Sequence, residues 1–276
     1  MKRSRNRPAP DQGWQGQSPD CPWQCAAAAG RRPFALAGKV SLITGAAQRL
    51  GAALATGLAA RGSQVALHYH SSGAAARALA TKLRRAGAAV EIFEADLERA
   101  EECALMAEAV LERFGTVDVL VHSAARFEQK AFTALTLDDW NRHLDLNLRA
   151  GFLLAQSLAP RMNRRGGKML FLADIAADRP WRGYLPYCVS KAGVVALTRA
   201  LAKELAPRIQ VNAIAPGTVL PPASFGTEQR ERLVRRIPLG RLGSPQDVVA
   251  TALFLLEGTD YITGAVVPVD GGRGLH

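Results

Sequence analysis

The chain has 276 residues, of which 48% are hydrophobic and 21% charged, and its formal net charge is +11. This composition is typical of a globular protein and excludes an intrinsically disordered chain. No apolar run reaches the roughly eighteen residues that a membrane-spanning helix needs, so we expect no membrane partner. The positive charge fits a basic surface or the attraction of a polyanionic cofactor, and we expect no nucleic-acid partner.

Four cysteines, at positions 21, 25, 103 and 188, are too few to form a disulfide framework in a chain of this size. A reducing compartment is therefore expected, and we predict a cytoplasmic protein. Cys21 and Cys25 could bind a metal ion, but nothing nearby completes the set of about four ligands that zinc requires. We expect no metal site.

Residues 1–35 are rich in Pro, Gly, Gln, Ser and Arg and have neither helical nor strand periodicity. We predict a disordered, dispensable basic tail, followed by one domain over residues 36–276. The run Ala26–Ala29 is too short for the core of a secretory signal. A transit-peptide character and an over-long start of the chain both remain open.

From Gly38 onward, short apolar runs alternate with Ala- and Leu-rich helical segments. This alternation predicts an α/β fold with a parallel sheet that is covered by helices on both faces. The predicted strands are 40–44, 64–69, 90–93, 117–121, 168–172, 209–214 and 265–269. The predicted helices are 51–61, 74–85, 101–114, 137–162 and 187–205.

A glycine-containing turn, residues 44–51, follows the first predicted strand directly. Gly45 permits a tight turn, and Gly51 at the helix start lets backbone amides approach a pyrophosphate. The helix N-terminus adds partial positive charge. An ordinary strand-to-helix turn is the alternative, but the position in the first βαβ unit favours dinucleotide binding.

The second strand ends without the Asp or Glu that binds the adenosine ribose in NAD-preferring sites. It offers His68 and His70, which should project to one side, and the hydroxyls of Ser71 and Ser72. Arg49 in the glycine loop adds a fixed positive charge. These residues favour NADPH over NADH, whereas a His-x-His metal pair would lack a third ligand.

The third strand ends near Asp96, which could accept the adenine amino group or could be only a polar strand end. Later in the chain, Tyr187 and Lys191 lie four residues apart at the start of a helix, so they face one side. A lysine cation beside a phenol favours phenolate. We therefore expect the pKa of Tyr187 to fall toward neutrality, which suits a general acid.

Several motifs together resemble the short-chain dehydrogenase/reductase family: Thr44-Gly45, Arg49-Leu50-Gly51, Asn147, Tyr187 with Lys191, Pro216-Gly217 and Val269-Asp-Gly-Gly272. The resemblance covers residues 38–275. It implies a Rossmann-type, doubly wound subunit, a homotetramer, and hydride transfer from nicotinamide. It also implies that Lys191 bonds the nicotinamide ribose and that Asn147 holds a relay water. Further implied cofactor contacts are Leu50, Leu97, Ser123, Ala124, Pro216, Gly217 and Val219.

The chain departs from the family at two points. The usual Asn-Asn-Ala-Gly is His122-Ser-Ala-Ala125, and the usual serine thirteen residues before Tyr187 is Asp174. An ionised carboxylate accepts hydrogen bonds only and would destabilise negative charge on a ketone oxygen. A carboxylate would instead stabilise the iminium-like species formed when a C=N bond is reduced.

The arginine-bearing loop, the His68–His70 strand end, Asp174 and Phe127 are similar to the pteridine reductases of this family. That resemblance implies that Phe127 stacks on a pterin and that Arg49 reaches both phosphate and pterin. We therefore predict NADPH-dependent dihydropterin reduction, with proton delivery by Asp174 and Tyr187. The alternatives are a reductase of a ketone, sugar or 3-oxoacyl thioester, with Asp174 as a neutral variation, and a non-catalytic NADP-binding regulator.

Overall fold

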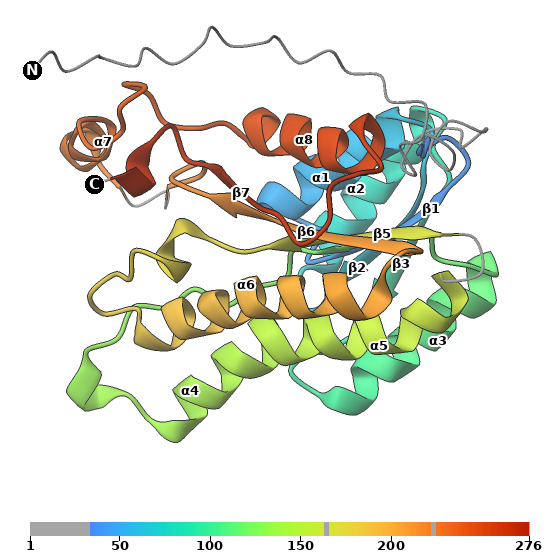
Figure 1. Cartoon of the computed structure of the whole chain (residues 1–276), viewed down its shortest axis with the longest axis horizontal. Helices are drawn as coiled ribbons and strands as arrows, with labels where there is room; N and C mark the ends of the chain where they lie inside the picture. The colour runs from blue at the N-terminus through green and yellow to red at the C-terminus, as the bar shows by residue number, and fades with distance from the viewer. Residues whose placement is uncertain (1–33, 163–165, 222–224, 276) are drawn as a thin grey trace, which may run out of the picture. The chain divides into compact units, whose positions relative to one another are not determined.

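The computed structural model describes residues 34–162, 166–221 and 225–275. These residues contain one seven-stranded, wholly parallel sheet with the order β3-β2-β1-β4-β5-β6-β7, as Figure 1 shows. This is the predicted doubly wound, Rossmann-type architecture. The strands are β1 Val40–Thr44, β2 Gln64–Tyr69, β3 Val90–Glu94, β4 Val119–His122, β5 Gly167–Leu172, β6 Ile209–Pro216 and β7 Val266–Val269.

Helices cover both faces of the sheet (Figure 1). One face is covered by α1 (Arg49–Ala60), α2 (Gly73–Arg85) and α8 (Pro245–Leu253), and a short helix, α7 (Thr227–Val234), lies beyond the end of β6. The opposite face is covered by α3 (Ala100–Phe114), α4 (Leu137–Leu144), α5 (Ala150–Met162) and α6 (Leu185–Leu205).

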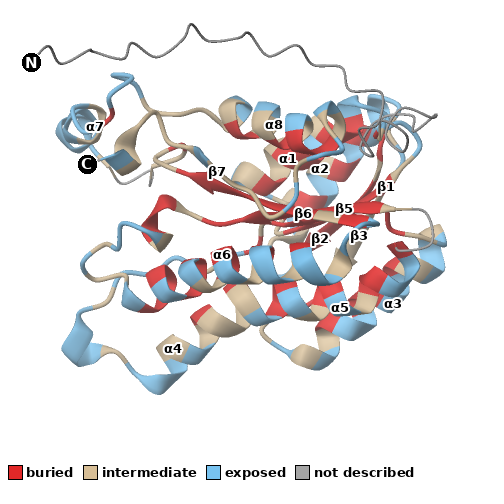
Figure 2. Ribbon diagram, in the orientation of Figure 1, coloured by how far each residue is buried: buried red, intermediate tan, exposed pale blue. Residues whose placement is uncertain are grey.

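The hydrophobic core consists of two layers, one on each side of the sheet. Leu58 of α1 and Val248 of α8 are fully buried in one layer. Met106 of α3, Leu154 of α5 and Val194 of α6 are buried in the other. Figure 2 shows the buried residues along the strands and on the inner helix surfaces. Because both faces are buried, the strands read as continuous apolar runs.

Most predicted elements lie within a few residues of the observed ones, and the differences concern one strand, one predicted helix and two helices that the prediction lacked. Strand β4 begins at Val119 instead of residue 117. The single helix expected over 137–162 is interrupted by a π-helix, Asp145–Arg149 (η2), between α4 and α5. Helices α7 and α8 were not predicted, because their short segments carry little apolar periodicity.

The described chain begins inside the residues that were predicted to form the tail. Phe34 packs against the core, with the ammonium groups of Lys39 and Lys168 5.4 Å and 5.3 Å from its ring centroid. The backbone N–H of buried Leu36 donates to Glu257 Oε1 at 2.9 Å. The rest of the predicted tail, with Cys21 and Cys25, lies outside the described residues.

Within the described ranges, no helix combines the length and hydrophobicity needed to cross a membrane. In the same ranges, the side chains form no cluster of three or more His, Cys, Asp or Glu suited to a metal ion.

Candidate active site

The loop between β1 and α1 needs glycine at two positions. Gly45 has a φ of +62°, and a Cβ there would lie 2.8 Å from the Cα of Ala124. A Cβ on Gly51 would clash with the backbone of Gly45. The first turn of α1 contains no acidic residue, and the side chain of Gln48 does not cap it. The amides at this helix start are therefore available to an anionic group such as a pyrophosphate.

His68 is buried with both ring nitrogens bonded within the protein, which speaks against the prediction that it contacts the cofactor. Its side chain is buried, its Nδ1 accepts from the Gly45 N–H at 3.0 Å, and its Nε2 lies 3.0 Å from the Ala95 carbonyl. Burial lowers the pKa of His68 to about 4, so the ring is neutral with the proton on Nε2. His68 therefore holds the glycine turn in place.

A second buried histidine connects the same loop to the π-helix. The Thr44 hydroxyl accepts from the Ser123 and Ala124 N–H groups, both at 3.0 Å, and lies 3.0 Å from His122 Nδ1. Nε2 of His122 lies 3.2 Å from the Leu146 carbonyl. Burial, and then the charge of Lys191, lower the pKa of His122 to about 3. The neutral ring can thus accept from Thr44 and donate to η2.

Of the remaining residues predicted at the adenosine end, His70 and Ser71 are exposed after β2. The Ser72 hydroxyl accepts from Gln48 Nε2 at 3.1 Å. Arg49 has a φ of +53°, and its guanidinium donates to the Leu220 carbonyl at 2.5 Å, so it contacts the segment after β6. Asp96 Oδ1 accepts from the Glu98 N–H at 3.0 Å, which tightens the turn after β3.

The other predicted cofactor contacts gather at the carboxyl ends of the strands. Pro216 ends β6, and the Gly217 N–H donates to the Val269 carbonyl at 2.9 Å. A Cβ on Gly217 would lie 2.8 Å from the Cα of Asp270. Leu97 and Val219 are buried, whereas Leu50 is partly buried. In doubly wound sheets, ligands bind at the carboxyl ends of the strands, where these residues lie.

Tyr187 and Asp174 form a direct hydrogen bond. The Tyr187 hydroxyl donates to Asp174 Oδ2 at 2.7 Å, and Asp174 Oδ1 accepts from the Ala176 N–H at 2.8 Å. Asp174 therefore caps the short helix Ile175–Ala177 (η3), which fixes its carboxyl group beside the phenol. Burial raises the pKa of Asp174, although those two hydrogen bonds and nearby positive charges oppose the shift.

The pKa of Tyr187 lies well above its ordinary value, so our expectation that Lys191 lowers it is wrong for the free protein. Burial and the adjacent Asp174 carboxyl group disfavour the phenolate. Lys191 lies one turn further along α6, with Nζ 5.8 Å from the phenol ring centroid and 2.5 Å from the Leu172 carbonyl. Burial lowers the pKa of Lys191 to about 8, which weakens its effect on the phenol.

Asn147 is fully buried in the π-helix. Its Oδ1 accepts from the Arg126 N–H at 2.7 Å, and its Nδ2 donates to the Arg126 carbonyl at 3.1 Å and to Ser190 Oγ at 2.8 Å. The side chain therefore joins the segment after β4 to α6. A π-helical turn frees backbone groups from the regular ladder and is frequent at functional sites.

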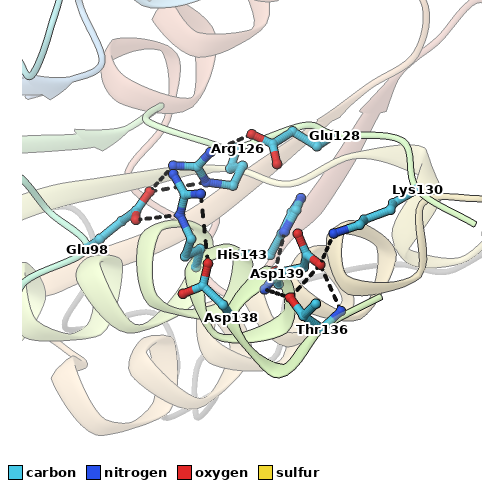
Figure 3. A network of polar contacts seen from close by, with 9 residues as sticks. Glu98, Arg126, Glu128, Lys130, Thr136, Asp138, Asp139 and His143 are labelled. Carbon is cyan, nitrogen blue, oxygen red and sulfur yellow. Dashed lines mark hydrogen bonds and ion pairs between the residues drawn. The ribbon is translucent and has the colours of Figure 1, made fainter. Parts of the chain in front are cut away.

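A network of ion pairs supports this region (Figure 3). Arg126 lies between Glu98 and Glu128 and pairs with both, and Glu98 also accepts from Arg142 Nε at 3.2 Å. The turn after β3 is thereby tied to α4. The segment from Arg126 onward is thus held by side chains as well as by Asn147.

Aromatic side chains surround the Tyr187 phenol. Phe127, which is 46% exposed, stacks on Tyr184 at a centroid distance of 4.6 Å and meets the edge of Tyr187 at 4.8 Å. The Trp181 ring lies 6.4 Å from that of Tyr187. Phe127 is therefore beside the phenol, as a residue that contacts substrate should be.

Sequence reasoning named Thr44 only as part of a family motif and missed three further residues of this region: Trp181, Tyr184 and Arg273. The guanidinium Cζ of Arg273 lies 5.2 Å from the Trp181 ring centroid. The only signals were a threonine before the first glycine and a basic residue directly after Gly271-Gly272.

Comparison with known proteins decides the family. A sequence profile described as Enoyl-(Acyl carrier protein) reductase matches residues 45–273. The 3-oxoacyl-[acyl-carrier-protein] reductase of Aquifex aeolicus is 36% identical over 243 residues, which cover 86% of this chain and 98% of that protein. The chain belongs to the short-chain dehydrogenase/reductase family. A reductase of the same name from a Synechocystis species is 35% identical, with the same coverage.

Similar solved structures lead to the same family assignment. A short-chain dehydrogenase/reductase mutant from Serratia marcescens has a TM-score of 0.82 at 32% identity, and covers 87% of this chain and 99% of its own. A blue fluorescent protein from a metagenomic library, in complex with NADPH, has a TM-score of 0.81 at 32% identity, with 86% and 98% covered. The chain is therefore an oxidoreductase of this family.

The prediction of pterin reduction is wrong. Several relatives at 33–36% identity are named 3-oxoacyl-[acyl-carrier-protein] reductases, which supports the alternative of a generic carbonyl reductase. The prediction rested on Asp174, because we reasoned that an ionised carboxylate would disfavour a ketone and favour a C=N substrate. Burial raises the pKa of Asp174, so this carboxyl group is protonated more readily than one in water, and only in the protonated form can it donate a hydrogen bond as a serine hydroxyl does.

Proposed function

We propose that this protein is an NADPH-dependent carbonyl reductase that acts on a small-molecule ketone, with a 3-oxoacyl thioester as the best-supported form. The observation that carries the proposal is the joint placement of Tyr187, Asp174 and Lys191 beside the carboxyl ends of the strands. The names of the relatives support the substrate class.

The residues of the glycine loop fit a dinucleotide. A side chain larger than hydrogen at Gly45 would collide with the backbone of Ala124, and one at Gly51 with the backbone of Gly45, so the glycines keep the turn tight before the N-terminus of α1, which no side chain caps. We assign the preference for NADPH to the absence of an acidic residue at the end of β2, where His70, Ser71 and Ser72 stand. The NADPH complex of a solved relative supports this assignment.

NADPH, when bound, supplies the hydride that adds to the carbonyl carbon. Tyr187 holds the proton for the carbonyl oxygen. Its O–H turns from Asp174 Oδ2 to that oxygen, so the O–H bond of the phenol breaks as the new alcohol O–H forms. Lys191, with a pKa of about 8, provides the positive charge that stabilises the phenolate left behind.

Asp174 has two tasks in this scheme. In its protonated form it donates a hydrogen bond to the substrate oxygen, where negative charge develops. It can also return a proton to the Tyr187 phenolate through the 2.7 Å contact. Asn147 positions α6 through Ser190, and we assign to it the water of the relay.

We also propose a homotetramer. Apolar side chains remain exposed on the outer surfaces of α4, α5 and α6: Leu137 (74%), Phe152 (41%), Leu185 (43%) and Val189 (39%). Large apolar side chains clustered on neighbouring helices are typical of a protein interface. A helix-to-helix contact between subunits would bury them.

The test is NADPH oxidation with acetoacetyl-CoA, a cyclic ketone and an aldose in parallel, each repeated with NADH. We expect turnover of at least the thioester, with NADPH much preferred. Absence of turnover with every carbonyl compound, despite measurable NADPH binding, would overturn the proposal.

A further inference from the structure

A half-buried arginine from the end of the chain lies beside the Tyr187 site. Arg273 begins the short helix Arg273–Leu275 (η5), directly after the turn at Gly271 and Gly272. The Asp270 carboxylate shapes this turn, since it accepts from the Gly272 N–H at 2.8 Å and from the Gly274 N–H at 2.6 Å. The position of Arg273 is therefore set by the backbone and does not depend on a flexible tail.

The guanidinium of Arg273 is held on two sides. Its Cζ lies 5.2 Å from the Trp181 ring centroid, and its Nη1 donates to Thr218 Oγ1 on the loop after β6. In the described part of the chain, Arg273 forms no ion pair with a carboxylate. Its remaining N–H groups suit a planar, bidentate acceptor.

The charges around Arg273 leave the region positive. Asp174 and Asp270 interact with it favourably, whereas Arg236 interacts unfavourably. Asp270 already accepts two backbone N–H groups, and Asp174 accepts the Tyr187 hydroxyl. Lys191 adds a further positive charge near Asp174. An anionic substrate group would balance this excess.

We propose that Arg273 is a specificity-determining residue that binds a carboxylate on the substrate, which makes the preferred substrate a keto acid with an apolar or planar body. Phe127 and Trp181 would contact that body while the carbonyl meets Tyr187. The inference rests on the proposed carbonyl reductase function, and within the carbonyl compounds it favours keto acids over the 3-oxoacyl thioester. A guanidinium that clamps a carboxylate would also orient the carbonyl toward the phenol.

The test compares matched keto acids and their methyl esters: benzoylformate, benzoylacetate and 4-acetylbenzoate, which place the carboxylate at three distances from the carbonyl. For the wild type we expect kcat/KM for at least one acid to exceed that of its ester by about 10-fold or more. Arg273→Met should lower kcat/KM for that acid by about 10- to 100-fold and leave the ester nearly unchanged.

Two further variants separate charge from structure. Arg273→Lys keeps the charge without the fork and should restore part of the acid activity, mainly through KM. Arg182→Met removes an exposed arginine next to Trp181 and should leave the acid-to-ester ratio unchanged. An equal loss for acid and ester in Arg273→Met would overturn the inference, because the arginine would then act through Asp174 or the fold.

Calorimetric binding of acid and ester to the protein–NADP⁺ complex distinguishes the two proposals. If no ketone is reduced but acid binding depends on Arg273, the reductase proposal fails and the carboxylate site stands. If the protein reduces neutral ketones but binds acids no better than esters, the carboxylate site is wrong and the reductase proposal stands. Absence of both turnover and Arg273-dependent binding overturns both.

Discussion

The Tyr187 hydroxyl donates to the Asp174 carboxyl group at 2.7 Å, so the proposed proton donor of this site is paired with an acid at the position where the family pattern that this sequence resembles has a serine. The pKa of each group lies above its ordinary value, chiefly through burial. The pair therefore retains a proton to a higher pH than a carboxyl group in water would.

Replacement of Asp174 by Asn should separate the two tasks of the carboxyl group. The amide always donates a hydrogen bond, whereas the wild-type carboxyl group donates only when protonated. The wild-type kcat should therefore fall as the pH rises through the raised pKa of Asp174. The kcat of Asp174→Asn should not show this fall. The measurement is kcat for acetoacetyl-CoA with NADPH from about pH 4, close to the ordinary pKa of an Asp carboxyl group, to about pH 9.

Asp174→Ser is the matched control, since serine restores the residue usual in the family. Its ketone reduction should equal or exceed that of the wild type. A loss of about 100-fold or more in both variants, over the whole pH range, would show that the ionised carboxylate is required.

His122→Asn should reduce the acid sensitivity of the fold. The folded pKa of His122 is about 3, against 6.5 for an ordinary histidine, so between these values the unfolded chain binds a proton that the folded chain does not. Stability is thus lost as the pH falls through this window. The measurement is the free energy of unfolding in urea at about pH 7.5 and at about pH 4.5. Between these two pH values, the free energy of unfolding should fall by about 1–3 kcal/mol less in the variant than in the wild type. An equal fall in the variant and in the wild type would contradict the assignment of the His122 ring as neutral and buried.

His70→Asp should weaken the use of NADPH. The exposed side chain at the end of β2 would place negative charge where the adenosine 2′-phosphate is proposed to bind. We expect kcat/KM with NADPH to fall by about 10-fold or more while that with NADH is kept or rises. His70→Asn introduces no negative charge, so the ratio of kcat/KM with NADPH to kcat/KM with NADH should change little. Equal effects on the two cofactors would place the phosphate elsewhere.

Phe152→Glu should dissociate the proposed tetramer, because it adds a charge to the apolar surface of α5. Light scattering should give a tetramer mass for the wild type and a smaller mass for the variant. Leu105→Glu, on the 62% exposed Leu105 of α3, should leave the mass unchanged. A monomeric wild type would remove the basis of this prediction.

The sheet and the glycine loop could be predicted because each depends on local sequence. Apolar runs such as Val40–Thr44 are long enough for strands buried on both faces, and the loop glycines follow the first run directly. The spacing of Tyr187 and Lys191 likewise requires only one helical turn. Helices α7 and α8 lack such a pattern, and α8 begins on a Ser244–Asp247 capping box instead.

The orientation and charge of the site residues could not be predicted, because they depend on contacts between distant segments. His68 is buried because the Gly45 loop and Ala95 cover the end of β2. The pKa of Tyr187 rises chiefly because the phenol is buried, and further because η3 directs Asp174 toward it. From the residue type alone, Asp174 indicated an ionised group and hence the wrong substrate.

The most direct test of the central claim is kcat/KM for acetoacetyl-CoA in the wild type and in Tyr187→Phe, with the NADPH dissociation constant measured for both. The phenylalanine ring keeps the packing against Phe127 and removes only the hydroxyl. We predict that kcat/KM falls by about 100- to 10,000-fold while NADPH binding changes little. A Tyr187→Phe enzyme that reduces the thioester as fast as the wild type, or a wild type that reduces dihydropterins but no carbonyl compound, would contradict the account.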